Sequence, residues 1–364
     1  MSNKTTVGLL FGGKSPEHNI SILSAKNIFS AIDKDRFDVI LIYINRAGVW
    51  HFCKDGMLLE NGDDPKTVTY IGEKTQVSLS QNANDRQLID ATSGEVIAKI
   101  DVLYPVLHGN FGEDGSIQGF AKLANIACVG CGILGSAVGM DKDIVKRILR
   151  DAGIGVADFV TLRKAYNEDM NYEEVIAKLG KELFVKPANL GSSVGVSFVA
   201  DENAYNQAVE VGFSYDTKVL VEEKVTGREI ECAVMGNEII EASVIGEILP
   251  KSSWYSFENK YVDEDGAKLA IPAQLTPAQA EKARNTAIET YRLLECRGLT
   301  RVDMFLLADD HIIVNEVNTL PGFTKVSMYP KMWEAAGLPY QQLVTKLIEL
   351  AIEEHQKMNA LMLI

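Results

Sequence analysis

The chain has 364 residues, of which 46% are apolar and 24% are charged, and its formal net charge is −14 at pH 7. This length and composition predict a soluble globular protein of two or three domains, with a core large enough to fold without disulfide bonds. The strong negative charge argues against nucleic-acid and anionic-membrane partners, so an anionic ligand would need a local cluster of lysine, arginine and backbone N–H groups.

The cysteines and the apolar runs indicate the compartment. Five cysteines are too few for a disulfide framework, and Cys128 and Cys131 form a lone CxxC with no second pair or nearby histidine to complete a zinc site. We interpret them as small buried thiols at a strand end, the alternatives being redox or metal roles. The chain shows no signal peptide and no uninterrupted apolar stretch of about 18 residues. We therefore expect a cytoplasmic protein.

The first third of the chain alternates strands and helices. Buried strands are expected at "TTVGLLFGG", "FDVILIYIN" and "KIDVLYPVLHG". A helix is expected over "SPEHNISILSAKNIFSAI", with Ser15 as N-cap, Pro16 at its first position and Glu17 in its first turn. This order predicts a parallel sheet with helices on its faces, and Glu17 and His108 follow strand ends, where ligands gather in such sheets.

Other segments complete the expected elements. Residues 50–98 are polar and weakly periodic, and we expect an irregular elaboration of the first domain there. After Met140, alternating strands and tight turns predict antiparallel sheet, followed by helices at 277–294 and 340–357. The strands "RVDMFLL" and "HIIVNEVN" are expected to pair as a hairpin around a turn at 308–311.

Two glycine-rich segments invite a phosphate-binding interpretation. Residues 8–15, "GLLFGGKS", match the Walker A pattern formally, but Gly8 lies inside a strand and Pro16 removes an N–H from the helix start, so we reject that motif. The segment "VKPANLGSSVGVSF" is more persuasive, because its glycines allow close backbone approach and Lys186 adds a charge suited to phosphate. A flexible hairpin loop is the alternative.

Hard oxygen ligands gather on the expected hairpin. Glu316 and Asn318 are two residues apart on one strand and share a face, and pairing around 308–311 would bring Asp303 close to Glu316. Such donors beside a phosphate site suit Mg²⁺. Arg301 shares the face of Asp303, and a structural ion pair between Arg301 and Glu316 is the alternative.

These motifs together resemble a known family. A glycine-loop lysine followed in order by "VEEK", "RVD" and "NEVN" resembles the ATP-grasp ligases. The stretches "FGGKSPEHNIS", "HGNFGEDGSIQG", "MDK", "KPANLGSSVGVS", "NKYVDEDG" and "NEVNTLPGFTKVSMYP" narrow the resemblance to D-alanine–D-alanine ligases of the longer bacterial form. The resemblance implies an α/β (α+β) fold. It consists of an N-terminal parallel βαβ domain (1–138), a central ATP-grasp subdomain (139–226) and a C-terminal one (227–364) whose lid is the loop 250–266, with antiparallel sheets clamping ATP.

The resemblance also implies an activity. Family members phosphorylate the carboxylate of one D-alanine with ATP, and the amine of a second D-alanine attacks the acyl phosphate, which yields a dipeptide for peptidoglycan precursors. Two Mg²⁺ (or Mn²⁺) ions would be held by Asp303, Glu316 and Asn318. The residues implied in ATP binding are Lys142, Lys186, Ser192, Ser193, Glu222, Val225, Glu229 and Lys260. A homodimer through the N-terminal region is also implied.

The same resemblance implies substrate and catalytic residues. Glu17 would pair with the first ammonium and would form a lid-closing triad with Ser192 and Tyr261. The remaining assignments are His108 near the first carboxylate, Ser327 and Lys260 on the second carboxylate, Met328 in the second pocket, and Arg301 with the Gly322 N–H on the oxyanion. A structural role for His108 remains the alternative.

Rival functions remain open within the resemblance. Tyr261, where D-lactate ligases often have histidine, favours an amine nucleophile, and Met328 favours D-alanine over D-serine or D-lactate. "CRGLTRVDMFL" also resembles the resistance-type ligases. Another ATP-grasp ligase and a non-catalytic nucleotide-binding regulator are the further alternatives.

Overall fold

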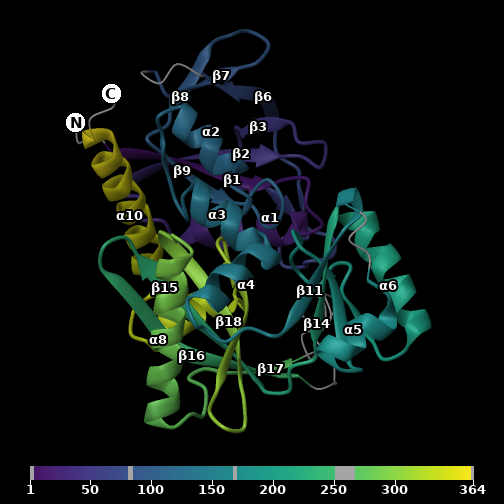
Figure 1. Cartoon of the computed structure of the whole chain (residues 1–364). Helices are drawn as coiled ribbons and strands as arrows, with labels where there is room; N and C mark the ends of the chain where they lie inside the picture. The colour runs from purple at the N-terminus through teal and green to yellow at the C-terminus, as the bar shows by residue number, and fades with distance from the viewer. Residues whose placement is uncertain (1–3, 81–84, 167–169, 251–266, 362–364) are drawn as a thin grey trace.

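The structure is a computed structural model that describes residues 4–80, 85–166, 170–250 and 267–361. Three main sheets organise it: eight strands in the N-terminal part, four in the middle part and five in the C-terminal part. In Figure 1 the N-terminal part lies above, and the other two parts stand side by side below it.

Parallel strands form the core of the first sheet, as predicted. They are β1 (Thr5–Gly12), β2 (Phe37–Ile44), β9 (Val102–Val106) and β10 (Ala127–Cys128), in the order β10-β9-β1-β2. Every residue of β9 is buried, as expected for a strand inside a parallel sheet. The helices of this part are α1 (His18–Ala31), α2 (Ser116–Leu123) and α3 (Ile133–Met140).

The prediction that residues 50–98 are irregular is wrong. Short antiparallel strands continue the first sheet, in the order β3-β6-β7-β8: β3 (Trp50–Cys53), β6 (Lys74–Leu79), β7 (Gln87–Asp90) and β8 (Val96–Lys99). A separate pair is formed by β4 (Leu59–Glu60) and β5 (Thr69–Tyr70). Only part of the residues in these strands are buried, and β6 alternates exposed with buried positions near its end. Such strands lack the continuous apolar run that identifies β1 as a strand in the sequence.

Helix α1 begins later than predicted. Its first residue is His18, and Glu17 occupies the N-cap position without a side-chain capping bond. Ser15 still organises the turn, because its Oγ accepts a hydrogen bond from the Glu17 N–H at 3.1 Å. The Glu17 carboxylate is therefore not used for capping.

The middle part is an antiparallel sheet covered by helices. Its strands are β11 (Phe159–Arg163), β12 (Leu183–Pro187), β13 (Ser197–Val199) and β14 (Lys218–Glu223), in the order β11-β14-β12-β13. Helices α5 (Tyr172–Leu179) and α6 (Glu202–Tyr215) pack on it, the short helix η1 (Lys164–Tyr166) follows β11, and α4 (Lys142–Asp151) precedes it.

The C-terminal part carries the expected hairpin. Its strands are β15 (Arg228–Gly236), β16 (Ile240–Pro250), β17 (Ala267–Ala270), β18 (Gly298–Leu306) and β19 (Ile312–Asn318), in the order β17-β16-β15-β18-β19. All neighbours are antiparallel. Helix α8 (Pro277–Leu293) lies across this sheet, begun by a Thr276 capping box.

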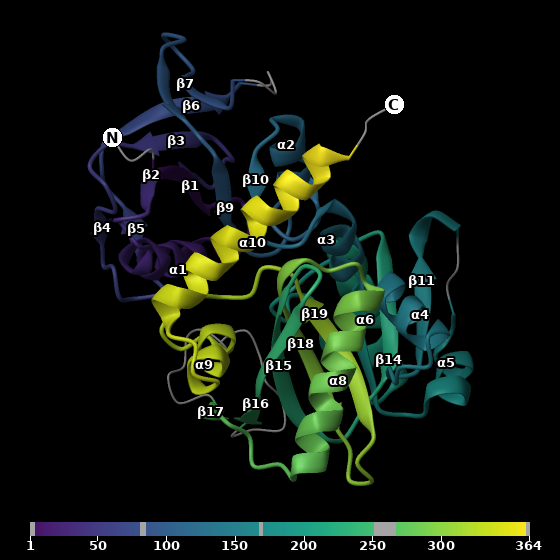
Figure 2. The ribbon, with the colours of Figure 1, turned by 90° about the vertical axis from the view of Figure 1, so that its left-hand side faces the viewer.

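The last two helices, α9 (Met328–Ala335) and α10 (Tyr340–Ala360), connect the C-terminal part to the first sheet. Figure 2 shows α10 running along the N-terminal part. One hydrophobic cluster contains Val7 and Ile28 together with Trp333 and Leu347, so the two ends of the chain share a core. Among the helices in the described ranges, none is both long and apolar enough to cross a bilayer.

Candidate active site

A cavity of about 210 Å³ is lined by residues from the middle and C-terminal parts. Seven residues that the sequence singled out line it: Lys142, Lys186, Ser193, Glu222, Val225, Glu229 and Glu316. The remaining wall residues are the apolar Ala157, Phe184, Leu190, Val196, Phe305 and Ile313 and the polar Glu223, Lys224 and Asn315. A cavity with both apolar walls and several charges suits a ligand with a flat base and an anionic end.

Lys142 stands at the start of α4, where Asp141 caps the helix by accepting hydrogen bonds from two backbone N–H groups. Its Nζ donates to the Leu190 carbonyl at 2.5 Å and lies 3.8 Å from Glu316 Oε2. Burial lowers the pKa of Lys142, although Glu316 acts in the opposite direction. The Lys142 ammonium group thus contacts both the segment that contains Leu190 and the strand β19 that carries Glu316.

A buried ionic cluster backs the cavity. Glu222 on β14 lies 2.7 Å from Lys186 Nζ and 3.3 Å from Lys146 Nζ. Burial alone would raise the pKa of Glu222, but the two ammonium groups hold it below its usual value. Two cations against one carboxylate leave a positive charge close to the cavity, which suits phosphate.

Lys146 is a residue that sequence reasoning missed. Its side chain is 1% exposed, and burial lowers its pKa. The signal was present, because Lys146 follows Lys142 by four residues and therefore shares its face of the helix.

The glycine-rich segment Gly191–Gly195 connects β12 to β13. Ser192 and Ser193 both adopt positive φ, at 54° and 59°, a backbone conformation that is uncommon for residues other than glycine. Such strain concentrates at ligand-binding sites. Ser193 lines the cavity, and Ser192 precedes it in the same turn.

The acidic residues of the hairpin lie together as predicted. Asp303 on β18 is directly opposite Glu316 on β19, and Asn318 Nδ2 donates to Asp303 Oδ2 at 3.0 Å. An irregularity in the register, next to Asp303, accompanies this pairing.

Arg301 is engaged by carboxylates. It donates to both oxygens of Asp303, at 2.7 and 2.8 Å, and its Nε lies 2.9 Å from Glu231 Oε2 on β15. Arg301 is therefore held in ion pairs with Asp303 and Glu231, whereas the alternative considered from the sequence named Glu316 as its partner.

The donor set at the hairpin fits a hard cation. Two carboxylates and an amide on facing strands supply oxygen ligands beside the cavity. Among the described residues, no three His, Cys, Asp or Glu side chains gather as a metal site, since the third predicted ligand is an asparagine.

Glu17 and His108 both follow the carboxyl ends of the neighbouring strands β1 and β9. Both are buried, and a Cβ added to Gly109 would lie 3.7 Å from Glu17 Oε2. His108 Nδ1 contacts the Leu320 carbonyl at 3.1 Å, while its buried Nε2 has no hydrogen-bond partner among the described residues. His108 thus makes a structural contact and keeps one ring nitrogen available.

Glu113, within "HGNFGEDGSIQG", is a second residue that sequence reasoning missed. Its carboxylate accepts hydrogen bonds from the Gly109 N–H at 2.9 Å and from the Leu320 N–H at 3.2 Å. Burial raises its pKa to about 7, and the negative charge of Glu17 adds to that effect. No pattern in the sequence marks this residue, because its partner Leu320 lies 207 positions away.

The segment after β19 carries the remaining predicted residues. Gly322 is partly exposed between the buried Pro321 and Phe323. Ser327 Oγ accepts a hydrogen bond from the Thr324 N–H at 2.9 Å.

Three predicted residues need separate comment. Met328 is buried in the core against Gly246, so any effect on substrate choice would act through the packing of α9. Lys260 and Tyr261, like the lid residues 251–266, lie outside the described residues, and the Glu17–Ser192–Tyr261 triad stays a prediction.

Known proteins resemble this chain over nearly its whole length. Family models described as the D-ala D-ala ligase N-terminus and C-terminus match residues 6–131 and 148–349. A D-alanine–D-alanine ligase of Shouchella clausii is 52% identical over 354 residues, which cover 97% of this chain and 96% of that protein.

Solved structures agree with this match. The VanG D-Ala:D-Ser ligase of Enterococcus faecalis shares 36% identity and a TM-score of 0.84, covering 96% of this chain and 100% of that one. A D-alanine–D-alanine ligase of Bacillus anthracis complexed with ATP shares 28% identity and a TM-score of 0.73, with 97% and 99% coverage. These matches confirm the predicted ATP-grasp fold, and the chain belongs to the D-alanine–D-alanine ligase family.

Proposed function

We propose that this protein uses ATP to join two D-alanine molecules into D-alanyl-D-alanine, which supplies peptidoglycan precursors. The observation that carries the proposal is the family match over nearly the whole chain, at 52% identity to a D-alanine–D-alanine ligase. The cavity supports it, because seven residues singled out from the sequence line that one space.

ATP would bind in this cavity. Lys142, Lys186 and the Ser192–Ser193 turn would contact the phosphates, together with Lys260 of the lid. Glu222, Val225 and Glu229 would frame the adenine and ribose, beside the apolar walls. A Bacillus anthracis relative of this fold has been solved in complex with ATP, which supports ATP as a substrate.

Asp303, Glu316 and Asn318 would hold two Mg²⁺ or Mn²⁺ ions. When bound, such ions neutralise phosphate charge that would otherwise repel an anionic substrate. Arg301 and Lys142 already contact these carboxylates, so the site brings cations to the same oxygens.

The first step would form an acyl phosphate. Glu17 would pair with the ammonium of the first D-alanine, with His108 near its carboxylate. A carboxylate oxygen attacks the γ-phosphorus, the bond between the γ-phosphorus and the bridging oxygen breaks, and ADP leaves.

The second step would form the dipeptide. Ser327 and Lys260 would bind the carboxylate of the second D-alanine, whose amine attacks the acyl carbon. Arg301 and the Gly322 N–H would stabilise the tetrahedral oxyanion. The carbon–oxygen bond to phosphate then breaks, and the proton lost by the amine is taken up by the leaving phosphate.

Gly322 suits this role on geometric grounds. Within the described part of the chain, no hydrogen bond involves the Gly322 N–H. In its neighbour Phe323, by contrast, both the backbone N–H and the backbone carbonyl are hydrogen-bonded. A preorganised N–H donor without a partner is what an oxyanion requires.

Several finer assignments belong to the same proposal. The domains would be 1–138, 139–226 and 227–364, and the lid 250–266 would exclude water from the acyl phosphate through the Glu17–Ser192–Tyr261 triad. The protein would act in the cytoplasm as a homodimer. A sedimentation run that finds only a 40.0 kDa species would refute the dimer.

A D-alanyl-D-serine ligase is the second candidate, because the VanG D-Ala:D-Ser ligase shares this fold at 36% identity. The test is ATP-dependent phosphate release with D-alanine alone, then with added D-serine or D-lactate, with products identified by mass. D-alanyl-D-alanine as the main product would support the proposal. A dominant mixed product would favour the second candidate, and no release with any substrate would refute both.

A further inference from the structure

The turn that carries Gly322 is held by the N-terminal part of the chain at the peptide groups that flank it. On one side, the Leu320 N–H donates to Glu113 Oε2 at 3.2 Å, and the Leu320 carbonyl contacts His108 Nδ1 at 3.1 Å. Both polar groups of Leu320 are therefore bound by a single loop, residues 107–115, which we name the clamp loop.

The other side of the turn is anchored independently. The Phe323 N–H donates to Ser24 Oγ at 3.2 Å, and its carbonyl accepts from Asn27 Nδ2 at 3.2 Å and from the Tyr340 hydroxyl at 2.9 Å. Pro321 and Gly322 span the gap between these anchors. The position of the Gly322 N–H is consequently set by both anchors.

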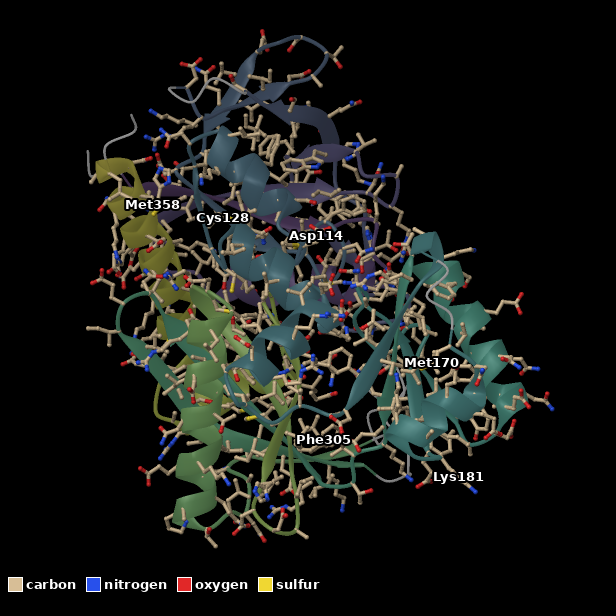
Figure 3. The ribbon with its side chains drawn as sticks, in the orientation of Figure 1. Asp114, Cys128, Met170, Lys181, Phe305 and Met358 are labelled. Carbon is tan, nitrogen blue, oxygen red and sulfur yellow. The ribbon has the colours of Figure 1, made fainter. Side chains whose placement is uncertain are left out.

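The clamp loop is itself well defined. The Glu113 N–H donates to the Gly109 carbonyl at 2.8 Å, and its Oε1 accepts from the Gly109 N–H at 2.9 Å. A Cβ on Gly112 would lie 2.2 Å from the Leu107 carbonyl, so the loop can fold this tightly only with glycine there. Figure 3 labels Asp114, the residue after Glu113, on the N-terminal part of the molecule, near the middle of the view.

A carboxylate is chemically suited to this position. Two backbone N–H groups point at Glu113, and only a side chain with two acceptor oxygens satisfies both. A glutamine would satisfy one N–H and turn its own NH₂ group toward the other. Both bonds are part-buried, so a backbone N–H left here without its acceptor would carry a desolvation cost.

We propose that Glu113 is a positioning residue for the second chemical step, because it fixes, through the Leu320 peptide, the turn that presents the Gly322 N–H to the oxyanion. In this role Glu113 would act through the backbone and not by contact with substrate or ATP. The inference rests on the proposed ligase function and adds to it a residue that ties the N-terminal part to the reacting carbon.

The test compares Glu113→Gln and Glu113→Ala with Asp114→Asn. Asp114 is a matched control, because it is in the same loop and also accepts from two backbone N–H groups, those of Phe111 and Ser116, but makes both bonds locally. Three quantities are measured in each full-length protein: kcat for dipeptide formation, KM for ATP, and D-alanine-dependent positional isotope exchange in ATP, which reports acyl phosphate formation.

We expect Glu113→Gln to lower kcat about 10- to 100-fold and Glu113→Ala to lower it further, since a small displacement of a catalytic donor has effects of this order. KM for ATP should stay within about 2-fold, and isotope exchange should persist, because the first step does not use the Gly322 N–H. Asp114→Asn should keep kcat within about 3-fold of the wild type, which is the range of an uninvolved surface change.

Two results would overturn the inference. A Glu113→Gln enzyme with kcat within about 3-fold of the wild type would show that the clamp does not matter for catalysis. An equal loss of exchange and ligation would show that Glu113 supports the first step or the fold as a whole, and circular dichroism would identify the latter. If the wild type itself neither exchanges nor ligates, the proposed function fails first, and this inference fails with it.

Discussion

Replacing Glu222 by glutamine should destabilise the fold much more than replacing Lys146 by methionine. Glu222 lies between two buried ammonium groups, 2.7 Å from Lys186 and 3.3 Å from Lys146. At an effective dielectric constant of about 20, these distances correspond to gross attractions of about 6 and 5 kcal/mol. Because the two values are similar, the desolvation of whichever charges remain decides the net effect.

The two substitutions leave different charges behind. Glu222→Gln leaves two buried lysines without their shared counter-charge, and breaking a buried pair in this way typically costs about 3–5 kcal/mol. Lys146→Met removes one of two cations, keeps the Glu222–Lys186 pair and conserves side-chain volume. Its cost should be about 1 kcal/mol or less, the usual range of volume-conserving changes.

The measurement is the free energy of unfolding from urea titrations followed by circular dichroism, with equal slopes as a check. Glu182→Gln serves as the control, because Glu182 pairs with Lys224 at 2.9 Å on the surface, with 59% of the glutamate side chain exposed. That change should cost less than about 1 kcal/mol. Two results would contradict this expectation: a loss of stability in Lys146→Met as large as that in Glu222→Gln, or a loss in Glu222→Gln as small as that in the surface control.

Three further outcomes are expected. Arg301→Ala should lower kcat about 10²- to 10³-fold, since it removes an oxyanion donor, and near-normal kcat would contradict its assignment. Gly322→Ala should also lower kcat, because the new Cβ would lie 2.9 Å from Ser327 Oγ and shift the turn. Steady-state kinetics should show an unchanged KM for ATP, and a changed KM would indicate that Gly322 contributes to ATP binding instead. Folding raises the pKa of Glu113 from 4.5 to about 7, so between those pH values the native state keeps a proton that the unfolded state has lost. The free energy of unfolding of the wild type, relative to that of Glu113→Gln, should therefore fall as the pH rises through this range. The expected fall is at most about 3 kcal/mol. Urea titrations at pH 5 and pH 8 test this, and a difference independent of pH would show that Glu113 is not protonated in the fold.

Local sequence patterns were enough to predict the hairpin of the site and the parallel sheet. The hairpin that places Asp303 opposite Glu316 follows from two apolar strands and a short turn, and the structure shows that register. The parallel sheet also follows from its order of strands and helices, because connections between neighbouring elements are short.

Errors in the sequence-based description arose where local signals were weak. Residues 50–98 form strands that bury only part of their residues, and their pairing depends on the edge that β2 offers. Helix α1 begins at His18 because Ser15 and Pro16 form a separate turn before it.

The family, the order of the elements and the chemical types present in the site could all be read from the amino-acid sequence, since each depends on short stretches of neighbouring residues. The pairing of Lys146 with Glu222, and the bond from the Leu320 peptide to Glu113 207 positions away, became visible only in the folded chain. The reason is physical: a buried charge or a backbone N–H is paired by whichever group the packing brings near it, and that partner leaves no periodic trace in the chain.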